Sequence, residues 1–195
     1  MEMEDRMDKI LVLRPVLKKI SEGSIFRVLF AWAMRIEAAL TLLGVIYGSV
    51  KMWGLIRGGG APASAYFGLL IVQIALLVLG LVIVNILLVR AEDIERQPIG
   101  SDYIVTPIIV IFQKTLGEIG AAVYAVLGVA AGLFIWIAGD KIPLPIPGFS
   151  GGDGFAGGLI AMIMGLTIGF AILAFSYFIA EITGAVVDIA RNTKK

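Results

Sequence analysis

The sequence contains no cysteine and no histidine among its 195 residues. Disulfides, zinc sites, iron–sulfur clusters and histidine-ligated haem therefore have no ligands within it. Catalytic groups of the Ser-His-Asp or Cys-His kind are excluded for the same reason. We accordingly expect no cofactor, no metal site and no enzymatic activity.

Charge is scarce as well. Only 16% of the residues are charged, whereas 59% are hydrophobic and the mean hydropathy is +0.97. Soluble domains carry more charge and less apolar surface than this. The composition therefore predicts an integral membrane protein with the lipid bilayer as its first partner. The net charge of +1 gives no clustered basic excess for phosphate, so no nucleic-acid partner is expected.

Four apolar runs are long enough to cross a hydrocarbon core of roughly 30 Å at about 1.5 Å per residue. They cover about 37–56, 65–89, 119–139 and 155–180. We expect the first helix to begin at Ile25, after Ser24 as its capping residue. On this helix Trp32 and Trp53 lie about 31 Å apart along the axis, as two aromatic belts require. The prediction is an all-α integral membrane fold with four transmembrane helices.

The distribution of Lys and Arg predicts the orientation. Of the 16 basic residues, 13 lie before the first run, between the second and third, or after the fourth. Only Lys51, Arg57 and Lys141 lie on the other side. By the positive-inside rule both termini face the cytoplasm, with the chain in the inner cell membrane. The turns at 58–62 and 141–148 are then outside.

A glutamate borders each apolar run on the predicted cytoplasmic side: Glu37, Glu92, Glu118 and Glu181. A carboxylate at the border of the hydrocarbon is costly, so it calls for a partner or a function. Lys114 lies four residues before Glu118 and Arg35 two before Glu37, which makes ion pairing at the inner leaflet one interpretation. In the alternative interpretation, the carboxylates bind a cation or a proton, and the residues that do so are Glu37, Glu118 and Glu181.

An internal repeat is visible between the two halves of the chain. Residues 43–48 (LGVIYG) match 127–132 (LGVAAG), and Gly80 with Ala91-Glu92 matches Gly169 with Ala180-Glu181. Duplication predicts two tandem helical hairpins, 25–98 and 99–195, after an N-terminal segment at 1–24. The alternative is that short Gly, Ala and Leu matches arise by chance in apolar helices.

Glycines four residues apart occur in three of the four runs, as Gly44 and Gly48, Gly128 and Gly132, and Gly165 and Gly169. Such pairs let helix backbones approach closely, and they predict packing within the chain or against another chain. The competing explanation is that glycine is simply commoner in membrane helices. Gln73 and Asn85, within the second run, are more typical of interhelical hydrogen bonds than of a conduction path.

The segment from Asp8 to Ile20 places apolar residues at helical spacing opposite three lysines. This pattern predicts a short interfacial helix in the cytoplasmic headgroup layer, where anionic lipid would attract it. A linker helix that touches a partner subunit is the alternative.

The second half also carries a family likeness. Val105-Thr106-Pro107 precedes an apolar span and a glycine-rich turn, and the next span ends at Glu181, followed by Ile189 and Asn192. Residues 101–195 thus resemble a bacterial family of small two-helix membrane proteins of unknown function. The first half departs from this pattern, because Glu92 is followed by Asp93-Ile94-Glu95-Arg96 without the Ile and Asn. The resemblance implies a two-helix fold and no activity.

These patterns favour a non-enzymatic membrane protein, a structural or accessory subunit that forms homo-oligomers or belongs to a larger complex. The alternative is a small cation or proton channel or transporter that uses the inner-leaflet glutamates. A lipid-organising protein is a third hypothesis.

Overall fold

The computed structural model describes residues 24–54, 62–97, 105–139 and 154–193. These residues form four α-helices and no strand: α3 (Ser24–Gly54), α4 (Ala63–Glu95), α5 (Val105–Ala138) and α6 (Gly154–Thr193). Each helix is long and apolar enough to cross a membrane. The prediction of an all-α four-helix membrane fold is confirmed. The predicted interfacial helix at 8–20 lies outside the described residues, as do the turn residues 58–61 and 141–148.

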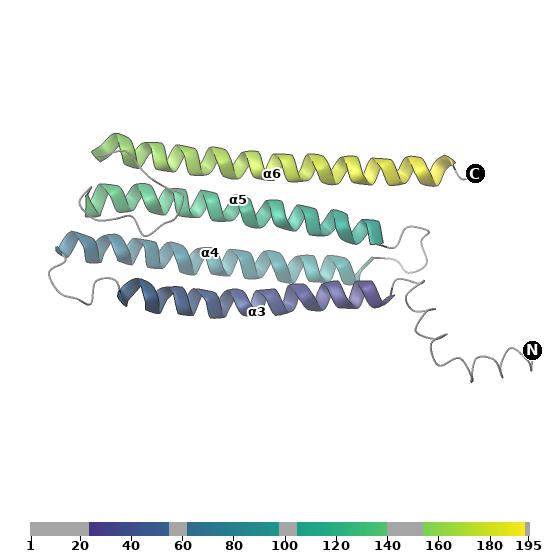
Figure 1. The fold of residues 1–195 in the computed structure, drawn as a ribbon, viewed down its shortest axis with the longest axis horizontal. Helices are drawn as coiled ribbons and strands as arrows, with labels where there is room; N and C mark the ends of the chain where they lie inside the picture. The colour runs from purple at the N-terminus through teal and green to yellow at the C-terminus, as the bar shows by residue number, and fades with distance from the viewer. Residues whose placement is uncertain (1–23, 55–61, 98–104, 140–153, 194–195) are drawn as a thin grey trace, which may run out of the picture.

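The four helices lie side by side in chain order (Figure 1). The main contacts join helices that are consecutive in the chain, α3 with α4, α4 with α5 and α5 with α6. Because α3 and α6 meet no further helix on their outer sides within the described residues, they are the two edges of the row. The bundle is therefore open, and most of its apolar surface faces outward.

Local sequence explains where the helices begin and end. In hydrocarbon every backbone N–H and C=O has to be paired within the segment, which only a helix or a closed barrel achieves. Helix α5 ends at Ala138, and the next residue, Gly139, has a φ of +76° that suits glycine and donates its N–H to the Ile135 carbonyl at 3.1 Å. Helix α6 begins at Gly154, which also has a positive φ of +67°. Pro62 precedes α4 and accepts the Ala65 N–H at 2.9 Å.

Two helices extend well past the apolar runs that predicted them. Helix α5 begins at Val105 rather than near residue 119, and α6 continues to Thr193 rather than ending near Ala180. Charged residues end an apolar run, but they do not end a helix, because Lys and Glu are good helix formers. The described part of the first helix extends to Gly54, and its predicted end at Ile56 lies outside the described residues.

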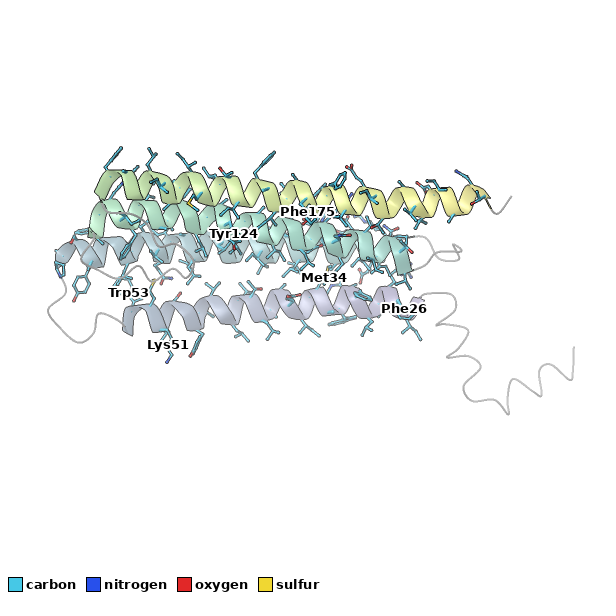
Figure 2. The ribbon with its side chains drawn as sticks, turned by 45° about the horizontal axis from the view of Figure 1, so that its top comes forward. Phe26, Met34, Lys51, Trp53, Tyr124 and Phe175 are labelled. Atoms are coloured by element: carbon cyan, nitrogen blue, oxygen red, sulfur yellow. The ribbon has the colours of Figure 1, made fainter. Side chains whose placement is uncertain are left out.

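The core divides into two clusters along the length of the row. Near the α5–α6 turn the buried residues are Met52, Leu69, Val72, Ala130, Ala131, Phe134, Ile135, Ala138 and Ala161. At the other end they are Ala31, Met34, Ala38, Leu87, Ala91, Ile94, Ile108 and Ile111, which come from α3, α4 and α5 only. Figure 2 shows Met34 pointing from α3 toward its neighbours and Lys51 pointing away from them. Helix α6 thus contributes no residue to this second cluster, although its Ala180 is buried.

Candidate functional site at the charged end

Arg90, near the end of α4, is the centre of a charged cluster that joins three helices. Its Nε donates to Glu118 Oε2 of α5 at 3.0 Å, and its Nη2 also donates to Glu118 Oε1. Its Nη1 donates to Asp93 Oδ2, one turn further along α4, at 2.8 Å. Tyr177 of α6 accepts a further bond from Nη2 at 3.2 Å. The guanidinium therefore uses its fixed fork geometry to hold a carboxylate on the next helix.

Tyr177 brings α6 into the same cluster. Its hydroxyl donates to Glu118 Oε1 at 2.5 Å. The ammonium of Lys114 lies 5.2 Å from the centre of the Tyr177 ring, within reach of a cation–π interaction. The side chains of Arg90 and Glu118 are only 21% and 17% exposed. A carboxylate this shielded is tolerated because its charge is paired and its oxygens are hydrogen-bonded.

A second ion pair lies nearby, between α3 and α4. Arg35 donates from Nη1 and Nη2 to the two oxygens of Glu95, at 2.7 and 2.8 Å. This pair is more exposed, with side chains 36% and 40% accessible. The pairing of Arg35 with Glu37 that the sequence suggested does not form in the described residues, because positions two apart point to different sides of a helix. Arg27 also reaches α4, donating to the Gln97 carbonyl at 3.0 Å.

The four predicted border glutamates lie on four different helices and do not converge. Glu118 is the one that bonds to other helices, through Arg90 and Tyr177. Glu92 accepts a bond from Arg96 of its own helix at 2.5 Å. Glu37 and Glu181 are exposed, and their carboxylates have no polar partner among the described residues. In those residues no three acidic groups gather closely enough to hold a metal ion.

The glycines of the second half lie in the contact between α5 and α6. A Cβ placed on Gly128 would lie 2.6 Å from the Gly165 Cα, and the reverse substitution meets the Gly128 Cα at the same distance. Gly169 faces the Ala121 carbonyl, and Gly132 lies against Gly158 and Met162. Atoms this close leave no room for side chains. These glycines therefore pack α5 on α6 within one chain, rather than on a second chain.

The matching glycines of the first half have different surroundings. Nothing lies within 4 Å of a Cβ placed on Gly44, and one on Gly48 makes an ordinary 3.4 Å contact with Leu76. The tight position between α3 and α4 is Gly80, which faces Val45. Of the glycines predicted to pack helices together, Gly44 makes no close contact among the described residues, whereas close contacts occur at Gly128, Gly132, Gly165 and Gly169.

The intramembrane polar residues do not continue the charged cluster. Gln73 donates from Nε2 to the Ser49 hydroxyl at 2.8 Å, and Ser49 in turn donates to the Val45 carbonyl. The Oε1 atom of Gln73 is buried without a partner in the described part of the chain. Asn85 is exposed on the outer surface of α4. Gln73 and Asn85 therefore form no shared polar path to Glu118.

Three members of the site lacked a clear signal in the sequence: Arg90, Asp93 and Tyr177. The available signal for Arg90 was its place at the end of the second run, opposite the start of the third where Glu118 lies.

Comparison of the chain with protein-family models, with curated proteins and with solved structures found no match. The likeness of residues 101–195 to a two-helix family therefore stays a prediction.

Proposed function

We propose that this chain is a non-enzymatic structural or accessory subunit of the inner cell membrane, with both termini in the cytoplasm. The proposal rests on the hydrogen bonds that the Glu118 carboxylate accepts from two other helices. This carboxylate accepts bonds from Arg90 of α4 and Tyr177 of α6, so the charge ties three helices together. A carboxylate that binds a transported cation needs oxygens free to exchange ligands and a hydrated route to reach them.

The close fit of α5 on α6 supports the same function. Gly128, in the last third of α5, and Gly165, in the first third of α6, bring the two backbones so close that no side chain fits between them. At one end this contact is closed by Trp136, which stacks on Phe155 with ring centres 5.0 Å apart and donates to the Phe155 carbonyl. We infer a rigid hairpin that presents its outer surfaces to lipid and to partner proteins.

The competing function is a cation or proton channel that uses the glutamates. Flux through purified protein in liposomes distinguishes the two. We expect no cation or proton flux above that of empty vesicles, and no change on replacing Glu118→Gln. The matched control is Glu92→Gln, because Glu92 is exposed and bonds only to its own helix. A flux that disappears in Glu118→Gln and persists in Glu92→Gln would overturn the structural proposal.

A further inference from the structure

Asn85 presents an amide on the outer surface of α4, inside an apolar run. The four apolar runs contain two amide side chains, those of Gln73 and Asn85. Gln73 donates to Ser49 of α3, whereas the Asn85 side chain is exposed and makes no hydrogen bond within the described residues. A hydroxyl in a helix can bond to the carbonyl one turn back, as Thr41 does with Glu37. Asn85 has no such bond, so its amide needs a partner outside the described chain.

The depth of Asn85 limits what this partner can be. Arg90 marks the charged end of α4, and Asn85 lies five residues, or about 7 Å, further into the apolar run. The exposed side chains around it are apolar: Leu81, Val82, Leu88 and Val89. Acyl chains offer no hydrogen-bonding group, and the short Asn side chain does not reach the headgroups as Lys and Arg do. The partner that remains is a polar side chain of another transmembrane helix.

The side of α4 that carries Asn85 is open to such a helix. Phe30 of α3 and Phe112 of α5 meet edge to face with ring centres 6.4 Å apart, so α3 and α5 approach each other on one side of α4. The buried residues of α4, Leu87 among them, face these neighbours. Asn85 precedes Leu87 by two residues and therefore lies about 200° around the helix from it. No described helix covers that side.

The exposed residues on either side of Asn85 form a seam of the kind that packs two helices. They alternate four and three positions apart, and they are Ile74, Val78, Leu81, Asn85 and Leu88. This is the a/d pattern of parallel helix pairs, in which a single Asn fixes the register. The next position, Glu92, lies past Arg90 and accepts a bond from Arg96 of its own helix. The apolar part of the seam therefore ends at the charged level.

We propose that a second copy of this chain packs on this seam, with the two α4 helices parallel and their Asn85 amides hydrogen-bonded to each other. An amide carries donors and an acceptor, so it is complementary to itself. Two copies inserted in the same orientation hold Asn85 at the same depth, and a two-fold axis normal to the membrane brings the two amides together. A helix without a polar group at that depth would leave the amide unpaired, which disfavours an entirely apolar partner. The inference rests on the proposed function and names the partner and its surface.

Cysteine cross-linking of the full-length chain in its own membrane tests the contact. Because the sequence has no cysteine, each single substitution gives one reactive thiol per copy. Leu81→Cys and Leu88→Cys place it on the seam, on either side of Asn85. Isolated membranes are oxidised with copper phenanthroline and separated on non-reducing gels.

The matched controls lie at the same depth on α3. Val45 of α3 faces Gly80 of α4, and the two helices are antiparallel, so Leu40 lies at about the level of Asn85. Leu40 and Leu43 are both exposed on the outer surface of α3. Leu40→Cys and Leu43→Cys therefore report random collisions of thiols at this depth.

We expect Leu81→Cys and Leu88→Cys to give several-fold more disulfide-linked product than the controls, at twice the 20.8 kDa of one chain. Adding Asn85→Leu to Leu88→Cys should reduce that product several-fold, whereas Asn85→Gln, which keeps an amide, should retain most of it. Because the Asn85 side chain is exposed and bonds to nothing in the described chain, both changes leave the fold intact.

Equal cross-linking on α3 and α4, no product at any position, or an unchanged product with Asn85→Leu would overturn the proposal. A bismaleimide adduct of another mass at Leu81→Cys, with no dimer, would also overturn it and assign the seam to a different protein. None of these outcomes depends on ion flux, so the contact and the proposed function fail separately.

Discussion

Tyr177 donates its hydroxyl to the Glu118 carboxylate at 2.5 Å, across the contact between α6 and α5. The same hydroxyl accepts a bond from Arg90, and the ring lies beneath the ammonium of Lys114. One aromatic side chain thereby connects α6 to the charges of two other helices. At this end of the row α6 contributes no residue to the apolar cluster that contains Met34, although its Ala180 is buried, so these hydrogen bonds add to the packing of α6.

Tyr177→Phe removes the donor to Glu118 and keeps the ring. A hydrogen bond to a charged group contributes about 1.5–3 kcal/mol, and partial exposure places this one near the lower figure. We expect a loss of about 1.5 kcal/mol in the free energy of unfolding, measured in detergent by tryptophan fluorescence. Tyr66→Phe is the control, because Tyr66 is exposed on α4 and has no bonded partner in the described chain. Equal losses in the two variants would contradict the role of Tyr177.

Removing Glu118 alone should cost more than removing Glu118 and Arg90 together. Glu118→Gln leaves the shielded Arg90 guanidinium with Asp93 as its remaining carboxylate partner, and breaking a shielded pair costs roughly 3 kcal/mol. In the double variant Glu118→Gln, Arg90→Gln, the charge left without its partner is Asp93, whose side chain is 37% exposed, so part of the loss is recovered. The same cycle on the more exposed Arg35 and Glu95 should give a smaller coupling, because water screens that pair. Similar coupling in the two cycles would show that shielding is unimportant.

Gly44→Ala and Gly128→Ala test two positions that the proposed repeat makes equivalent. A methyl group on Gly128 meets the Gly165 backbone and forces the two helices apart, at a cost of about 1–3 kcal/mol. On Gly44 it meets nothing within 4 Å, and alanine is the better helix former by about 1 kcal/mol. We expect Gly128→Ala to unfold at lower temperature and Gly44→Ala to be unchanged or stabilised. Matching destabilisation would show that Gly44 is also packed, against another chain.

The proposed orientation is tested by labelling single cysteines in intact cells. Ala63→Cys and Ser150→Cys should react with an impermeant maleimide, because both lie on the side with few Lys and Arg. Gln97→Cys, on the opposite side, should react only after the cells are lysed. The reverse pattern would place Arg90 and Glu118 at the outer leaflet.

The helices could be predicted from the sequence because a bilayer imposes both the length and the apolarity of each run. The ends of the helices could not be predicted in the same way, since α5 begins before Lys114 and α6 continues beyond Glu181. Helix ends depend on the backbone, and in this chain glycines at positive φ mark two of them.

The partners of individual residues were harder to predict, because they depend on which helices are neighbours. Glu118 was expected to need a basic partner, and the pairing with Arg90 follows from the contact of α4 with α5. Gly44 and Gly128 belong to matching motifs, yet only Gly128 faces the backbone of another helix in the described chain. No pattern within a motif encodes that difference.

The chain-order arrangement of the helices has a consequence for how the protein is made. Each helix after α3 contacts the one synthesised just before it, so a packing surface is available to each new helix once it enters the membrane. Arg90 gains its carboxylate partner when α5 enters, and Glu118 gains the Tyr177 hydroxyl when α6 follows. The row can therefore assemble in the order of translation, without any earlier helix having to leave a finished contact.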